Sequence, residues 1–208
     1  METIERKAHW EKIYSTKHPN EVSWFQEIPS TSIGLIKELN LPSSAKIFDN
    51  GGGDGKLVDH LLDMGFENIT VLDISSHALE KAKQRLGDKA QKVNWVIADE
   101  AHCDIPGQYD VWHDRAAFHF LTEESDIENY INTIQKCIKP GGYFIVGTFS
   151  DQGPKKCSGL EIKQYSEKSL TEKLQGYFEK IKCFTIDHHT PFSTTQNFLF
   201  CTFKRMSK

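Results

Sequence analysis

The sequence predicts an α/β fold in which a largely parallel β-sheet carries helices on both of its faces. Short apolar segments alternate along the chain with longer segments whose apolar residues recur at helical spacing. Asp73, Asp99 and Asp114 each follow one of the apolar segments directly. Because the carboxyl ends of parallel strands meet at one edge of a sheet, we expect these carboxylates to gather where ligands bind. The length of 208 residues suits one such domain.

The first thirty residues lie ahead of this alternating pattern. The segment 4–16 predicts a helix in which Trp10 and Tyr14 are four residues apart, and 17–29 predicts an irregular stretch. Ser30 is a suitable N-cap for a second helix, because its hydroxyl can accept a hydrogen bond from a free backbone N–H. An irregular segment between two helices should therefore precede the sheet.

Seven strands and four further helices are expected in the rest of the chain. The strands are predicted at 45–49, 69–73, 93–98, 109–113, 143–148, 180–187 and 196–204, the last two as an antiparallel pair. The helices are predicted to begin after Gly55, at Ser75 or Ser76, at the capping box Ser125-x-x-Glu128, and near 167. Pro140-Gly141-Gly142 predicts a turn ahead of the fifth strand.

Charge and hydropathy argue against several classes of partner. The net charge of −4 disfavours nucleic acid, which usually requires a basic excess. No stretch approaches the roughly 20 apolar residues of a membrane span, and the first residues lack the apolar core of a secretory signal. We therefore expect a cytoplasmic protein without a membrane partner.

The cysteines and histidines suggest neither a disulfide framework nor a metal centre. The five cysteines are scattered and contain no C-x-x-C pair, so reduced thiols are expected. His188 and His189 are adjacent on a predicted strand and would point to opposite faces, so no metal site is expected from them.

The strongest signal for a ligand is the turn Asp49-x-Gly51-x-Gly53-x-Gly55, directly after the first strand. Glycines are needed where a ligand approaches the main chain with no Cβ in the way, and the following helix offers free N–H groups. A dinucleotide-binding turn would need glycine in place of Lys56, and a P-loop would need Ser or Thr in place of Leu57. Both phosphate-binding interpretations are therefore weakened.

This turn and the strand–helix order resemble the class I S-adenosylmethionine-dependent methyltransferases. The resemblance implies a Rossmann-like three-layer sandwich with a mostly parallel seven-stranded sheet, of order 3-2-1-4-5-7-6 and with an antiparallel last strand. It also implies one domain over 1–208, with an N-terminal helix and lid at 1–29 and a cofactor-binding core at 30–208. Trp-Phe-Gln at 24–26, Asp-Arg-Ala-x-Phe-His-Phe at 114–120 and Cys-Ser-Gly-Leu at 157–160 are similar to a small bacterial subgroup, some of whose members are described by analogy to trans-aconitate methyltransferase.

The resemblance implies S-adenosyl-L-methionine as the cofactor and S-adenosyl-L-homocysteine as its product. The glycine turn would wrap the methionine part, Asp73 would accept the ribose hydroxyls, and Ile74 would pack on the adenine. Asp99 would accept a hydrogen bond from the adenine amino group and Glu100 would supply a main-chain N–H. Without a ligand, these carboxylates would be ordinary residues of turns and helix caps. The implied cofactor-binding residues are Asp49, Gly51, Gly53, Gly55, Asp73, Ile74, Asp99, Glu100 and Asp114.

The methyl acceptor should lie where the fourth strand ends. In the family, residues there stand beside the reactive methyl, so Asp114 and His119 are expected to orient or deprotonate the acceptor, with Tyr14 as a third catalytic candidate. The alternative is that Arg115 pairs with Asp114 and that His119 only packs. Dense aromatic residues ahead of the core predict a lid that excludes water around the sulfonium. The expected substrate pocket comprises Trp10, Trp24, Phe25, Arg115 and Cys157.

We therefore predict in-line methyl transfer from S-adenosylmethionine to a small-molecule acceptor beneath an aromatic lid. The absence of an Asn-Pro-Pro-Tyr motif disfavours DNA bases and glutamine amides as acceptors. A lysine side chain of a protein is the alternative acceptor, and a non-catalytic S-adenosylmethionine-binding protein is the alternative from another class. A nicotinamide oxidoreductase ranks third, and the assembly is expected to be a monomer or homodimer.

Overall fold

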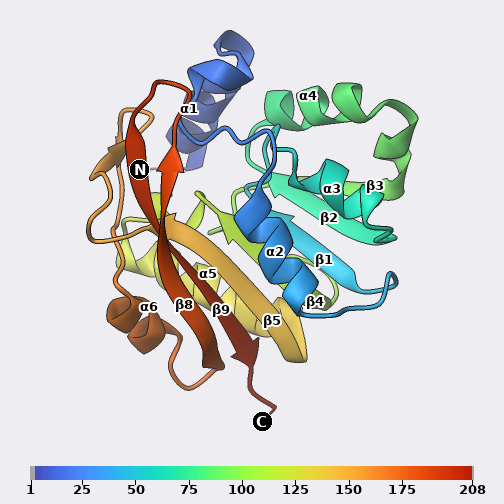
Figure 1. The fold of residues 1–208 in the computed structure, drawn as a ribbon, viewed down its shortest axis with the longest axis vertical. Coiled ribbons are helices and arrows are strands. Elements are labelled where there is room, and N and C mark those ends of the chain that lie inside the picture. The colour runs from blue at the N-terminus through green and yellow to red at the C-terminus, as the bar shows by residue number, and fades with distance from the viewer. Residues whose placement is uncertain (1–2, 208) are drawn as a thin grey trace.

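A computed structural model describes residues 3–207 and confirms the α/β fold. Its sheet has seven strands in the order β3-β2-β1-β4-β5-β9-β8 (Figure 1). Strand numbers follow the chain and include a two-stranded hairpin, β6–β7, outside this sheet. Without that hairpin the observed order is the predicted 3-2-1-4-5-7-6, and β9 runs antiparallel to β5 as predicted.

The elements fall close to their predicted positions. The strands of the main sheet are β1 (Lys46–Asn50), β2 (Asn68–Asp73), β3 (Val93–Ile97), β4 (Tyr109–Arg115), β5 (Ile138–Phe149), β8 (Phe178–His189) and β9 (Thr195–Arg205). The hairpin is β6 (Lys156–Cys157) and β7 (Leu160–Glu161). The helices are α1 (Thr3–Thr16), α2 (Ser30–Glu38), α3 (Leu57–Asp63), α4 (Ser76–Leu86), α5 (Glu124–Cys137) and α6 (Glu167–Leu174).

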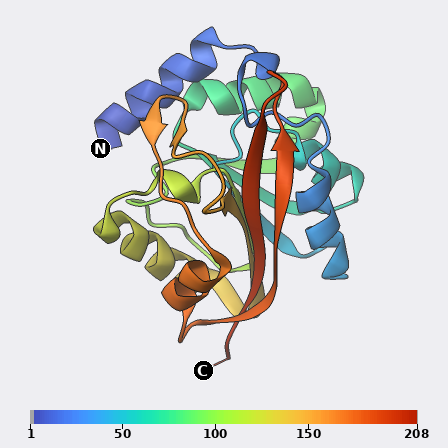
Figure 2. The ribbon, with the colours of Figure 1, turned by 60° about the vertical axis from the view of Figure 1, so that its left-hand side comes forward.

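Each face of the sheet is covered by its own apolar layer. Helices α5 and α6 pack on one face, and α2, α3 and α4 pack on the other (Figures 1 and 2). Neighbouring residues of β1 therefore serve opposite layers: Phe48 faces α5 and Ile47 faces α2, and both are fully buried. Burial on both faces explains why the strands read as continuous apolar runs.

Helix α1 lies across the end of the sheet, beside α4 (Figure 1). Its Glu11 carboxylate accepts hydrogen bonds from Ser75 Oγ and from the backbone N–H and hydroxyl of Ser76, each at 2.8 Å. The N-terminus of α4 favours a negative charge because its first N–H groups have no intrahelical partner. Glu11 therefore fastens α1 over the carboxyl ends of the strands.

The predicted turn Pro140-Gly141-Gly142 lies inside a strand. Strand β5 begins at Ile138, which pairs with Tyr109, and the register then shifts so that Tyr143 pairs with Val111. The extra residues form an irregularity in the ladder, where Gly141 has a φ of 79°. The prediction of a turn ahead of the strand is therefore wrong, because these residues form an irregularity within β5.

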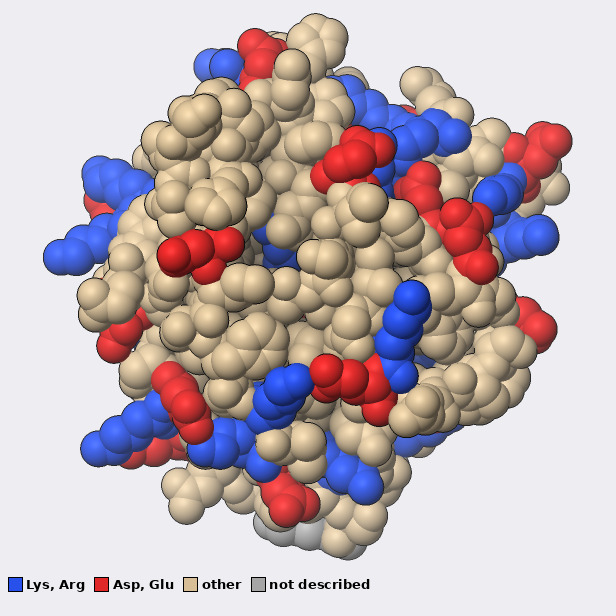
Figure 3. Space-filling view, viewed as in Figure 1, with Lys and Arg blue, Asp and Glu red and all other residues tan. Residues whose placement is uncertain are grey.

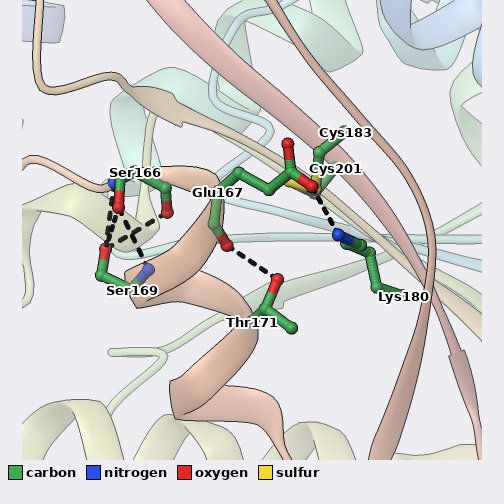
Figure 4. The surroundings of a disulfide bond; sticks show 7 residues. All are labelled: Ser166, Glu167, Ser169, Thr171, Lys180, Cys183 and Cys201. Atoms are coloured by element: carbon green, nitrogen blue, oxygen red, sulfur yellow. Dashed lines mark hydrogen bonds and ion pairs between the residues drawn. A yellow bond between two sulfur atoms is a disulfide. The ribbon is translucent and has the colours of Figure 1, made fainter.

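The expectation of five reduced thiols is wrong for two of them. Cys183 of β8 and Cys201 of β9 form a disulfide, close to the start of α6 (Figure 4). The two residues are direct partners in the antiparallel register, with Cα atoms 4.2 Å apart. Such pairs bring the Cβ atoms close together, and strand register cannot be read from cysteine spacing. Cys103, Cys137 and Cys157 are free thiols.

Two general observations concern the described residues. Within residues 3–207, no helix is both long and apolar enough to cross a membrane. Lys and Arg are interspersed with Asp and Glu over the face shown in Figure 3, in keeping with the small net charge of −4.

Candidate active site

The backbone of the glycine turn passes close to α1 and to the loop after β4. Gly51 and Gly53 adopt left-handed φ values of 61° and 55°, which glycine tolerates best. A Cβ on Gly53 would lie 2.5 Å from the hydroxyl oxygen of Tyr14, and one on Gly51 would lie 2.5 Å from the Cβ of Ala117. A side chain at either position would therefore collide with α1 or with the loop after β4.

Asp49 is held beneath this turn by a chain of hydrogen bonds. Its Oδ1 lies 2.7 Å from His113 Nδ1, and His113 Nε2 lies 2.8 Å from Ser32 Oγ. All three residues are buried. Sequence analysis missed Ser32 and His113, because their roles follow from the register of β1 against β4, in which Asp49 and His113 are direct partners.

Two adjoining cavities of about 60 and 70 Å³ lie around the turn. They share four wall residues, Tyr14, Trp24, Gly51 and Arg115, and are therefore two parts of one site. Of the predicted site residues, the first cavity also contains Trp10, Asp73, Ile74, Glu100 and Cys157, and the second contains Phe25, Asp49 and Gly55.

Asp73 stands at the end of β2, buried beside the turn. Its Oδ1 accepts a hydrogen bond of 2.8 Å from the backbone N–H of Ser75. Burial raises the pKa of Asp73 to about 7, and the nearby charges of Asp54 and Asp49 add to the effect. A carboxylate that is costly to keep charged gains most from hydroxyl donors brought by a ligand.

Asp99 does not line either cavity, and its neighbour Glu100 does. Arg6 of α1 donates to Asp99 Oδ1 at 3.0 Å and to Asp126 Oδ2 at 2.7 Å. Burial raises the pKa of Glu100 to about 8, with a further contribution from the charge of Asp99. The third strand end is therefore tied to α1 by a buried ion pair that the sequence did not predict.

Asp114 is fully buried behind the cavity wall. Its carboxylate accepts hydrogen bonds from Asn50 Nδ2 at 2.8 Å, Tyr130 Oη at 2.7 Å and the backbone N–H of Phe118 at 3.0 Å. It does not pair with Arg115, because successive strand residues point to opposite faces. These bonds fix the loop after β4. Asp114 lines neither cavity, so its position does not match the predicted contact with the acceptor.

His119 is also buried and lines neither cavity. Its ring stacks on Phe149 with centroids 4.4 Å apart, and neither ring nitrogen meets a hydrogen-bond partner among the described residues. Burial lowers the pKa of His119 to about 3, and the charge of Arg115 lowers it further. The contacts match the alternative reading, in which His119 packs.

Aromatic side chains close the site from the N-terminal side. The Trp10 ring contacts Trp24 and Phe120, with centroids 5.6 and 4.9 Å away. The Trp24 carbonyl accepts a 2.9 Å hydrogen bond from Arg115 Nη1, and His188 Nε2 bonds to the Ser23 carbonyl at 2.7 Å. The segment before α2 is therefore attached to both β4 and β8.

The catalytic and metal-binding possibilities of other side chains are limited. Burial raises the pKa of the Cys157 thiol to about 11, which disfavours the reactive thiolate. Within residues 3–207, no group of three or more His, Cys, Asp or Glu side chains is placed to hold a metal ion.

Residues 48–144 match the protein family described as Methyltransferase domain. EEF1A lysine methyltransferase 2 of Danio rerio is 27% identical over 132 residues, which cover 59% of this chain and 56% of that protein. Malonyl-[acyl-carrier protein] O-methyltransferase of Anoxybacillus flavithermus is 32% identical over 119 residues, covering 57% of this chain and 44% of that protein. The chain thus spans about half the length of these relatives.

Solved structures share the fold over nearly the whole chain. The 1,6-didemethyltoxoflavin-N1-methyltransferase of Burkholderia thailandensis, with bound S-adenosylhomocysteine, has a TM-score of 0.76 at 20% identity and covers 100% of this chain and 92% of its own. N-methyltransferase NodS of Bradyrhizobium japonicum, in complex with S-adenosylhomocysteine, has a TM-score of 0.71 at 15% identity and covers 99% of both chains. The match of residues 48–144 to the methyltransferase domain family, together with the strand order, therefore supports the predicted class I S-adenosylmethionine-dependent methyltransferase.

Proposed function

We propose that this chain transfers the methyl group of S-adenosylmethionine to a small-molecule acceptor. The observation that carries the proposal is the bare glycine turn, which lies beside the buried carboxylate of Asp73 and beneath the hydroxyl of Tyr14. We further propose that residues 1–29 act as a lid on a core formed by 30–208.

The residues present fit this cofactor. Gly51 lines both cavities with bare backbone, Gly53 lets the turn pass close beneath Tyr14, and Asp73 offers a carboxylate to ribose hydroxyls. Ile74 and Glu100 share the wall of the first cavity with Asp73, where the adenine would lie. Asp99 would contribute indirectly, by binding Arg6 of α1 and by positioning the adjacent Glu100.

When bound, S-adenosylmethionine supplies an electrophilic methyl group on a sulfonium. The chain's own task is then to align the acceptor and to keep water out. Trp10, Trp24 and Phe120 supply the apolar walls, and the aromatic faces also suit a sulfonium. Among the predicted catalytic residues, Tyr14 lines both cavities, whereas Asp114 and His119 are better assigned to positioning the loop.

A lysine side chain of a protein is the second candidate acceptor. It is supported by the relative named EEF1A lysine methyltransferase 2. The small-molecule assignment is supported by the closure of the cavities by α1 and the aromatic segment, and by the relative named malonyl-[acyl-carrier protein] O-methyltransferase, whose name specifies a malonyl acceptor.

Calorimetric titration with S-adenosylmethionine and S-adenosylhomocysteine tests the cofactor site. Gly53→Ala should reduce both affinities by at least tenfold, because its Cβ enters the space beside Tyr14. Gly107→Ala is the matched control, since Gly107 has a φ of 90° but nothing within 4 Å of the added Cβ. Equal affinity of Gly53→Ala and Gly107→Ala would remove the basis of the proposal. Transfer of a labelled methyl to small molecules or to intact proteins then separates the two acceptor classes.

A further inference from the structure

The guanidinium of Arg115, the last residue of β4, lies at the boundary of the two cavities. Its Nη1 donates to the Trp24 carbonyl, and its Cζ lies 5.2 Å from the centre of the Phe198 ring. Its Nε and Nη2 are buried and meet no hydrogen-bond partner in the part of the chain that the structure describes. Buried N–H groups of a charged side chain rarely stay without partners, because their desolvation is costly.

The two unpartnered nitrogens lie along one edge of the guanidinium. Their N–H groups point the same way, which suits two oxygens of one carboxylate. Arg85 of the same chain uses this edge on Asp59, with Nε–Oδ1 and Nη2–Oδ2 distances of 3.1 and 2.8 Å. Arg115 presents the same edge, and the bond from Nη1 to Trp24 fixes its direction.

The charge of Arg115 is not balanced by an ion pair. No carboxylate of residues 3–207 lies within ion-pair distance of its guanidinium, whereas Arg6 in the same cavity contacts both Asp99 and Asp126. Burial lowers the pKa of Arg115 to about 10, so the group is still protonated at neutral pH. Burial lowers the pKa of His188, and the charge of Arg115 is the second cause of this lowering.

The direction of the side chain indicates which molecule would bring the anion. Phe198 belongs to β9, and in the sheet order β9 lies beyond β5, on the side of β4 opposite to β1 and its glycine turn. The guanidinium is therefore in contact with the β9 side of the site, where Cys157 of β6 also lies, and it shares the walls of both cavities with Gly51 of the turn. Trp10 and Phe120 form apolar walls of the first cavity.

We propose that the methyl acceptor carries a carboxylate, which the Nε–Nη2 edge of Arg115 binds while Trp10 and Phe120 contact the acceptor's apolar body. This inference rests on the proposed function and names its substrate class. The other source of a carboxylate is the amino-acid end of the cofactor, and the experiment separates the two.

The test compares the wild type with Arg115→Lys, which keeps a positive charge but loses the two-pronged edge. Arg205→Lys is the matched control, because Arg205 lies at the far end of β9 and donates to the Ile138 carbonyl outside both cavities. The probes are benzoate, phenylacetate and indole-3-acetate, each beside its primary amide. Binding to the protein saturated with S-adenosylhomocysteine is measured by calorimetry and by saturation-transfer NMR.

At least one acid should bind the wild type about tenfold or more tightly than its amide, as expected for charge-assisted hydrogen bonds. Arg115→Lys should lose that preference, and Arg205→Lys should keep it. The proposal is overturned if no acid binds, if acid and amide bind equally, or if Arg115→Lys retains the preference.

The second arm measures the cofactor without an acceptor. S-Adenosylhomocysteine and 5′-methylthioadenosine, which lacks the amino-acid end, are titrated into the wild type and Arg115→Lys. Equal affinities for the two proteins support the acceptor assignment. A tenfold loss confined to S-adenosylhomocysteine would assign Arg115 to the cofactor's carboxylate and overturn it. Failure of the wild type to bind either nucleoside would instead refute the proposed function.

Discussion

The ion pair between α1 and the core makes a quantitative prediction for Arg6→Met. Arg6 contacts Asp99 at 3.0 Å and Asp126 at 2.7 Å, and the exposed fractions of the three side chains are 4%, 3% and 10%. Methionine fills much of the same space but leaves two carboxylates buried without their cation. Removing one partner of a buried pair costs about 3–5 kcal/mol.

The lower end of that range is expected for Arg6→Met, because His102 Nε2 lies 3.2 Å from Asp126 Oδ1 and can replace part of the lost contact. A loss of about 3 kcal/mol corresponds to a fall of roughly 6–12 °C in the unfolding midpoint for a chain of this size.

Urea unfolding at pH 8 measures this loss, and hydrogen exchange shows whether α1 detaches before the core unfolds. The control is Lys89→Met, which removes an exposed pair with Asp63 and should leave stability unchanged. If Arg6→Met is as stable as Lys89→Met at pH 8, the buried pair does not hold α1 as described.

Three further predictions concern the lid, the cofactor and the disulfide. Hydrogen bonds from His77, Ser76 and Ser75 lower the pKa of Glu11 to about 2 against the cost of its burial, so its contribution to stability is present above about 4.5 and lost as the pH falls toward 2. Glu11→Gln should therefore reduce the thermal midpoint at pH 7 and leave it unchanged at pH 2. Because the pKa of Asp73 is about 7 and its carboxylate form accepts hydroxyl donors, affinity for S-adenosylhomocysteine should fall between pH 8 and 6 in titrations, and Asp73→Asn should abolish that trend. Reduction of the disulfide, which spans 18 residues, should lower the free energy of urea unfolding by about 2–4 kcal/mol, with Cys183→Ser insensitive to reductant.

The sequence predicted the parts of the fold that local pattern determines. The strand order and the positions of Asp73 and Gly53 followed from hydrophobic period, turn residues and a family resemblance, because these signals lie within single segments. The hydrogen-bonded chain from Ser32 through His113 to Asp49 could not be predicted, since it joins a helix and two strands whose relative register no local pattern gives.

The same limit explains where the site differs from the prediction. Asp114 and His119 were predicted in the site because they follow a strand end, but Asp114 of β4 and His119 of the 3-10 helix Phe118–Phe120 are buried and line neither cavity. Arg115, one residue further along the strand than Asp114, points the other way and lines both cavities. Successive side chains of a strand point to opposite faces, so an error of one residue in the position of the strand exchanges the residue that faces the ligand with its neighbour. The sequence located the strand end only to within a residue or two.

The short turn after β2 contacts both the candidate ribose-binding carboxylate and helix α1. The backbone N–H of Ser75 donates a hydrogen bond to Asp73, and its hydroxyl donates one to Glu11. A nucleoside seated on Asp73 would thus rest on the same few atoms that hold α1 down. Loss of the nucleoside is therefore expected to loosen the attachment of α1, and loosening of α1 is expected to weaken the binding of the nucleoside.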